Sequence, residues 1–97
     1  MIQHIVMWKL KEADKKENAQ RIKKDLEALK DVISELEFIQ VSFNMDIAPQ
    51  NNFDVILNSQ FKSFEDLDIY AKHPEHVKVV EFIKSVVEQR VAIDYEI

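Results

Sequence analysis

The sequence predicts an α+β fold of the ferredoxin-like, split βαβ type, built on an antiparallel sheet. Its 97 residues suffice for one domain over residues 1–97. Apolar residues alternate with a period of two in four segments, and between them recur at helical spacing in two regions. The resulting order of strand, helix, strand, strand, helix pair, strand is that of the split βαβ arrangement.

The first predicted strand, residues 2–10, has apolar side chains in the middle of both faces. His4, Val6 and Trp8 share one face, and Ile5 and Met7 lie on the other. Because a solvated sheet face is normally polar, we expect this strand to be covered on both sides.

A long helix is predicted to begin near Asp14 and to end between Lys30 and Ser34. Asp14 can cap it, and Glu17, three residues later, completes a pattern like a capping box. One apolar stripe runs along it and predicts a core-facing side: Ala19, Ile22, Leu26, Leu29 and Ile33.

Two strands are predicted at residues 36–45 and 53–61, with a loop at 46–52 that contains Pro49 and an Asn pair. The second part of the chain should form two helices and a last strand. Ser63 is a predicted helix cap, and Pro74 is predicted to begin a broadly apolar and largely buried helix. The last strand is predicted from Val91 onward.

The stretch 70–76 holds the side chains best suited to chemistry, Tyr70, His73 and His76. His76 falls in the first turn of the helix that begins at Pro74, where the positive end of the helix dipole disfavours imidazolium. A neutral His76 could accept a proton, with Tyr70 as a hydrogen-bonding partner. The alternative is structural: a capping histidine and a core tyrosine whose hydroxyl reaches the surface.

Composition excludes several kinds of protein. The net charge of −5 argues against a nucleic-acid-binding surface, and the clustered basic residues of the first helix alternate with acids. Cysteine and glycine are absent, which excludes thiolate chemistry and glycine-rich phosphate loops. The histidines lack a third ligand in sequence range, so we expect no metal site and no cofactor. No apolar run reaches membrane-spanning length, so a cytoplasmic protein without membrane contact is expected.

The predicted layers leave one sheet face uncovered. Both helical regions should pack on the same face, while Ile5, Met7 and one face of the segment with Ile39, Val41, Phe43 and Met45 should form an apolar surface on the other. An exposed surface of this kind favours association. We therefore expect a twofold homodimer in which two sheets close face to face into a barrel.

Three motifs carry a family resemblance: residues 4–10 (HIVMWKL), the central Tyr70, His73-Pro74 and His76-Val77, and the closing Asp94-Tyr95. Together they resemble the stress-responsive dimeric α/β-barrel (Dabb) family over essentially the whole chain. The resemblance implies a homodimer of ferredoxin-like subunits.

Polyketide cyclases of that family imply a site. By resemblance, His76 would take the proton that generates an enolate, and Tyr70 would hold the carbonyl oxygen. The same resemblance places His4 and His73 at the pocket, with Val6 and Trp8 lining it.

Three kinds of function remain open. The first is a dimer that binds a small apolar or carbonyl-containing ligand in a pocket lined by Val6, Trp8, Tyr70 and Val80. The second is an enzyme of the cyclase or lyase kind that uses Tyr70 and His76 as an acid–base pair, or a haem-degrading monooxygenase in which a histidine binds iron. The third is a structural dimer without a ligand.

Overall fold

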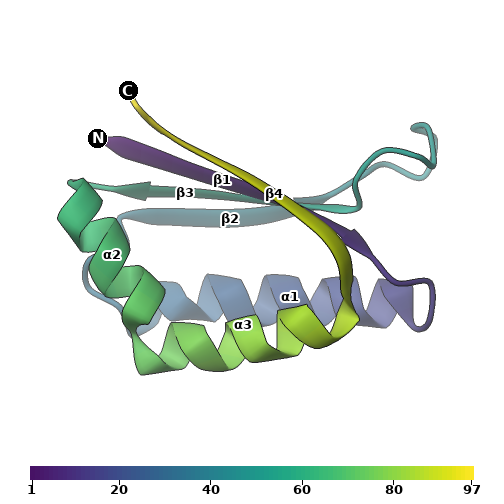
Figure 1. Ribbon diagram of the computed structural model, residues 1–97, viewed down its shortest axis with the longest axis horizontal. Helices are drawn as coiled ribbons and strands as arrows, with labels where there is room; N and C mark the ends of the chain where they lie inside the picture. The colour runs from purple at the N-terminus through teal and green to yellow at the C-terminus, as the bar shows by residue number, and fades with distance from the viewer.

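The computed structural model describes residues 1–97 as one antiparallel sheet with helices on a single face (Figure 1). The sheet order is β2-β3-β1-β4, which confirms the predicted ferredoxin-like fold. The elements in chain order are β1 (Ile2–Leu10), α1 (Lys15–Ala28), the 3-10 turn η1 (Leu29–Asp31), β2 (Phe38–Phe43), β3 (Val55–Phe61), α2 (Phe64–Lys72), α3 (Pro74–Val86) and β4 (Val87–Glu96).

The core lies between the sheet and α1, α2 and α3. Because side chains alternate along a strand, one face of every strand except β4 contributes to it. Its 16 members come from both layers: Val6, Trp8, Leu10, Ile22, Leu26, Leu29, Ile33, Leu36, Val41, Val55, Leu57, Phe61, Leu67, Tyr70, Val79 and Ile83. The predicted core-facing stripe of α1 is confirmed, since four of its five members are buried there and Ala19 packs against them.

The start of α1 differs in detail from the prediction. Asp14 occupies the cap position but adopts a left-handed conformation with φ 55°, and its side chain makes no cap hydrogen bond. The predicted capping box with Glu17 is therefore wrong. A capping box needs an extended cap residue, whereas Asp14 is left-handed at the end of the short turn between β1 and α1. The helix also ends earlier, at Ala28, and continues only as η1.

The apolar face of β2 points the other way from the prediction. Val41 is buried in the core, and Ile39 and Phe43 pack against the core. This face of β2 therefore points toward the helices and not toward the open side of the sheet. Met45 lies beyond the end of β2 at Phe43. Pairing explains the orientation: Val41 stands opposite Leu57, which in turn stands opposite Val6, and all three share the helix-covered face.

The free edge of β2 is covered by side chains from α1. Lys23 Nζ donates to the carbonyl of Val41 at 2.7 Å, and the amide of Val41 donates to Glu27 Oε2 at 2.9 Å. Lys23 and Glu27 also pair with each other at 2.8 Å. One helical ion pair thus satisfies both outward backbone groups of Val41, groups that an edge strand otherwise leaves open.

The joint between α2 and α3 follows the prediction closely. Ser63 caps α2 by accepting from the amide of Asp66 at 3.1 Å, and α2 ends at Lys72. His73 caps α3, which begins at Pro74 as predicted. Only Val79 and Ile83 of α3 are buried, so the helix is less buried than predicted.

The last strand begins earlier than expected, because β4 follows α3 directly, Val87 coming next after Val86. Its pairing with β1 puts Arg90, Ala92 and Asp94 on the helix-covered side, opposite Trp8, Val6 and His4. The alternating residues face the open side.

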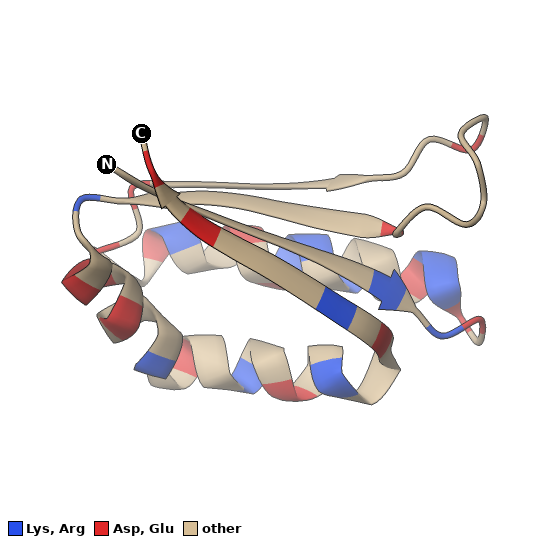
Figure 2. Cartoon of the chain, turned by 45° about the horizontal axis from the view of Figure 1, so that its top comes forward, with Lys and Arg blue, Asp and Glu red and all other residues tan.

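The open face of the sheet is rich in apolar side chains. Its central strand contributes Ile5 and Met7, as predicted, and the pairing adds Ile56 from β3 and Phe38 from β2. The largest share comes from β4, where Val91, Ile93 and Tyr95 are 45%, 59% and 43% exposed. Figure 2 shows charged residues on the helices, the loops and β4, whereas β2 and β3 carry none.

Candidate functional site

A cavity of about 620 Å³ lies between the sheet and the helices. This volume falls within the range of small-molecule sites in proteins. Its apolar walls come from β1, β3, α1, α2, α3 and β4. The apolar lining residues are Val6, Trp8, Leu26, Leu57, Phe64, Leu67, Tyr70, Ala71, Val77, Val80, Ile83 and Val87. Trp8 lines the space without filling it. Val77 and Val80 of α3 are not fully buried, because they border this cavity instead of packed core.

Tyr70 brings a buried hydroxyl to this cavity. The residue is 0% exposed, and its hydroxyl has no hydrogen-bond partner in the protein. Its ring packs on Phe61 with a centroid distance of 5.0 Å, which fixes its direction from α2. Burial raises the pKa of Tyr70 above its ordinary value of 10.0, so the phenol remains protonated and can donate a hydrogen bond.

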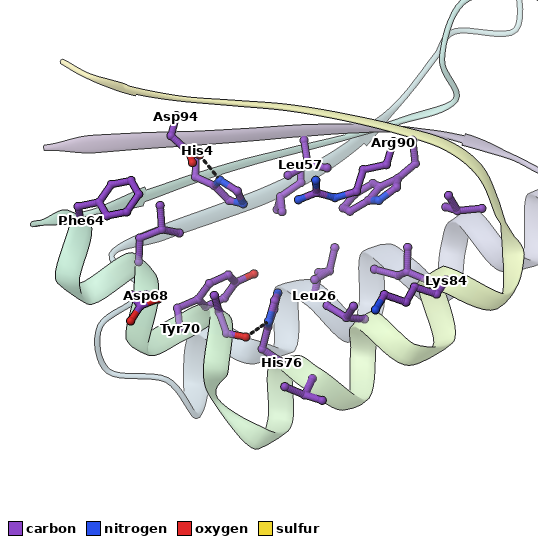
Figure 3. Close-up of a pocket in the computed structure, with 18 residues that line it drawn as sticks. His4, Leu26, Leu57, Phe64, Asp68, Tyr70, His76, Lys84, Arg90 and Asp94 are labelled. Atoms are coloured by element: carbon purple, nitrogen blue, oxygen red, sulfur yellow. Dashed lines mark hydrogen bonds and ion pairs between the residues drawn. The ribbon is translucent and has the colours of Figure 1, made fainter.

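His76 stands beside Tyr70, with 4.3 Å between the ring centroids. Its Nδ1 lies 3.0 Å from the carbonyl oxygen of Ala71, so in the neutral ring Nδ1–H donates to that oxygen. The other ring nitrogen, Nε2, then carries a lone pair toward the cavity (Figure 3). This tautomer is that of a base or a hydrogen-bond acceptor.

The surroundings of His76 keep it neutral. Burial lowers the pKa of His76 below its ordinary value of 6.5, against the hydrogen bond to Ala71, and the nearby Arg90 guanidinium acts in the same direction as burial. The sequence predicted a neutral imidazole from the helix dipole; in the structure, burial is the main cause.

Across the cavity, His4 pairs with Asp94. The two residues stand directly opposite each other in the β1–β4 register, and His4 Nδ1 hydrogen-bonds to Asp94 Oδ1. Figure 3 shows this pair on the sheet side, facing Tyr70 and His76 on the helix side. Held in this way, His4 also leaves its Nε2 available to a ligand.

Most of the predicted site residues come together. His4, Val6, Trp8, Tyr70, His76 and Val80 all line the cavity. His73 does not. Its Nδ1 accepts from the amide of Glu75 at 3.1 Å and so caps α3, which is the structural role considered as the alternative for a histidine at this turn.

Three charged residues of the cavity wall were not singled out from the sequence. Arg90 lies on β4, Lys84 on α3 and Asp68 on α2. Arg90 was missed because the last strand was predicted to begin at Val91. Extending the same alternation back by one residue would have put Arg90 on the face of Asp94.

No three His, Cys, Asp or Glu side chains are grouped so that they could hold a metal ion. No helix has both the length and the apolar character needed to cross a bilayer.

The fold and the site define a class: a ferredoxin-like α+β protein with a ligand-sized cavity between its sheet and its helices. The Stress responsive A/B Barrel Domain (Dabb) profile matches residues 2–97. The chain therefore belongs to the Dabb family, as the resemblance implied.

Known proteins agree with this assignment. A stress-response A/B barrel domain-containing protein of Arabidopsis thaliana is 31% identical over 96 residues, which are 98% of this chain and 36% of the plant protein. A second protein of the same description and organism is 25% identical over 99 residues. The chain spans less than half the length of these curated relatives, 36% of the first and 46% of the second.

Two solved structures show how far the fold extends. A dimeric protein with a ferredoxin-like fold from Bacteroides fragilis NCTC 9343 has a TM-score of 0.90 and 33% identity, covering 99% of this chain and 95% of that one. A hydroxynitrile lyase from Passiflora edulis has a TM-score of 0.85 and 20% identity, covering 99% and 92%. At 20% identity, the likeness to the lyase concerns the fold alone.

Proposed function

We propose that the protein is a homodimer that binds a small, largely apolar molecule with a carbonyl group in the cavity between sheet and helices. One observation carries the proposal: the Tyr70 hydroxyl is buried at the cavity without a partner. A buried polar group normally has a hydrogen-bond partner, and leaving one unpaired costs about 1–3 kcal/mol. A carbonyl oxygen is the acceptor that this donor lacks.

The dimer part of the proposal is supported by the open face of the sheet. Apolar side chains of β1 and β4 are exposed there, and the relative from Bacteroides fragilis is dimeric. Two such faces packed together would remove this apolar area from water.

A ligand screen with a matched variant tests the binding proposal. Thermal shifts are measured for the wild type and for Tyr70→Phe with aromatic and medium-chain ketones, aldehydes and β-oxo thioesters, each beside an analogue that lacks the carbonyl. We expect carbonyl compounds to stabilise the wild type and to bind Tyr70→Phe about tenfold more weakly, the value of one hydrogen bond. Equal binding by both proteins would contradict the proposal.

A second candidate is an enzyme of the cyclase or lyase kind, favoured by the neighbouring Tyr70 and His76. His76 Nε2 would take a proton from the carbon next to the ligand's carbonyl. The electrons of the broken C–H bond would move to form an enolate, whose oxygen Tyr70 would stabilise by donating a hydrogen bond.

Deuterium exchange separates this candidate from simple binding. NMR in heavy water follows loss of the α-proton from a ketone that binds the wild type. Exchange should fall about 100-fold or more in His76→Gln, which lacks a base. His73→Asn serves as control, since Asn also caps helices and His73 lies outside the cavity. A bound ketone that exchanges no faster than in buffer would leave a binding protein and remove the enzyme.

A further inference from the structure

The charges around the cavity do not balance locally. Its two carboxylates have partners: Asp94 pairs with His4, and Asp68 pairs with Lys72 at 2.8 Å. Its two permanent cations, Arg90 and Lys84, have none, since neither lies within 4.0 Å of an Asp or Glu oxygen. The cavity wall therefore carries unpaired positive charge, on the exposed residues Arg90 and Lys84, in a chain whose net charge is −5.

Arg90 is placed to reach a ligand. It stands opposite Trp8 in the β1–β4 register, on the face of the sheet that carries His4 and Asp94. Figure 3 shows its guanidinium extending from β4 into the cavity, while Lys84 approaches from α3 at the same end. The charge of Arg90 also contributes to the lowered pKa of His76, which agrees with a guanidinium on the same side of the sheet as the imidazole.

Tyr70 marks the other polar position of the cavity. Its unpartnered hydroxyl comes from α2, and the cavity that Tyr70 and Arg90 both line has mostly apolar walls, which include Leu57 and Ile83. A molecule that satisfies both polar positions needs an acceptor at one end, an anion at the other and an apolar body between them. Guanidinium binds carboxylate through two parallel hydrogen bonds, a geometry that an ester or an alcohol does not reproduce.

We propose that the ligand is an oxo-carboxylic acid: Arg90, assisted by Lys84, binds its carboxylate, and the Tyr70 hydroxyl binds its carbonyl oxygen. This assignment rests on the proposed function and narrows it to anionic carbonyl compounds. It also gives Arg90 the role of a specificity-determining residue.

The protein contains its own reporter for the test. Trp8 is the single tryptophan. It lines the cavity beside Arg90, its partner in the β1–β4 register. Quenching of its fluorescence measures binding of a series of 2-oxo to 5-oxo acids with phenyl or alkyl bodies. Each acid is compared with its methyl ester, which keeps the carbonyl and the apolar body but loses the charge.

We expect at least one acid to bind the wild type about tenfold or more tightly than its ester, with the difference shrinking as salt increases. Arg90→Gln should bind acid and ester alike, and Arg90→Lys should restore part of the preference. Lys24→Gln, which removes an exposed positive charge outside the cavity, should behave as the wild type.

Three results would overturn the assignment, and they differ from failure of the proposed function. If acids and esters bind equally while Tyr70→Phe weakens both, the carbonyl site stands and the carboxylate site is wrong. The carboxylate site is also wrong if Arg90→Gln keeps the preference for acids. If no acid in the series binds more tightly than its ester, the carboxylate site is again wrong, whatever the neutral carbonyl compounds do.

Discussion

The hydroxyl of Tyr70 does not stabilise the folded protein, so replacing Tyr70 by phenylalanine should cost no stability. Because it has no partner, Tyr70→Phe removes a buried polar atom without breaking a hydrogen bond. We expect the free energy of unfolding in urea to stay the same or to rise by about 1 kcal/mol. Tyr70→Ala removes the whole ring and should lower it by about 3–5 kcal/mol. A marked loss of stability in Tyr70→Phe would show that the hydroxyl is bound within the protein.

The lowered pKa of His76 predicts how stability depends on pH. The unfolded chain protonates this histidine near its ordinary value of 6.5, whereas burial delays protonation of the folded chain to lower pH. Stability from this residue is therefore fully present above about pH 6.5 and is lost as the pH falls toward the lower pKa of the folded state.

Urea unfolding at a series of pH values between about 7.5 and about 5 measures this effect. His76→Gln should flatten the dependence, while His73→Asn should preserve it. An unchanged slope in His76→Gln would contradict the assignment of a neutral, buried imidazole.

Local spacing explains which site residues the sequence could predict. Tyr70 and His76 are six positions apart across a turn that Pro74 defines, so their proximity follows from short-range rules. His4 and Asp94 are paired through the register of two strands at opposite ends of the chain. Short-range patterns do not give that register, and the resemblance supplied His4 instead.

At the level of elements, the ion pair of α1 has a structural role on the edge of the sheet. Burial by itself would raise the pKa of Glu27, but hydrogen bonds from Lys23 and from the Val41 amide outweigh it and lower the pKa. The carboxylate therefore stays charged at neutral pH and continues to accept the hydrogen bond from the Val41 amide of the edge strand.

Glu27→Ala should expose the amide of Val41 and lower the free energy of unfolding by about 1.5–3 kcal/mol, the range for a hydrogen bond to a charged group. Hydrogen exchange monitored by NMR should show faster exchange at Val41. Asp25→Ala is the control, because Asp25 pairs with Arg21 on the same helix and does not touch β2. Equal exchange rates in the two variants would contradict the role of Glu27.

The elements themselves were mostly predictable because their signals are local. Ser63 and Pro74 mark helix starts in the sequence, and both are found there in the structure. The left-handed backbone at Asp14 was not predictable, because glycine is the residue that usually signals this conformation and the chain has none. The orientation of β2 was also missed. An alternating pattern shows that one face is apolar but does not show which layer covers it.

For the whole molecule, the proposed dimer makes the open sheet face a site of association. Ile93→Lys puts a charge at the middle of the β4 part of this face, and burying that charge in an interface would be costly. Sedimentation at micromolar concentration should show a dimer for the wild type and a monomer for Ile93→Lys. Val32→Lys, an exposed apolar residue just after η1, should remain dimeric. A wild-type monomer would contradict the dimer.

The arrangement of the sheet and the helices in layers was predictable from which faces of the helices and strands are apolar, and not from any single residue. Two helical stripes and four alternating segments leave few arrangements in which every apolar face is covered. Ile5 and Met7 pointed correctly to the open side, while the chain's own contacts placed Ile39 and Phe43 with the core.

Strand β4 serves the two sides of the sheet at once. Arg90 and Asp94 face the cavity, and the residues between and beside them, Val91, Ile93 and Tyr95, face outward. A shift of β4 along β1 that follows ligand binding would therefore move the association surface by the same amount. Linkage requires such an effect to be mutual. If a bound ligand raises the affinity between the subunits by some factor, then the dimer binds the ligand more tightly than the separated subunits do, by the same factor.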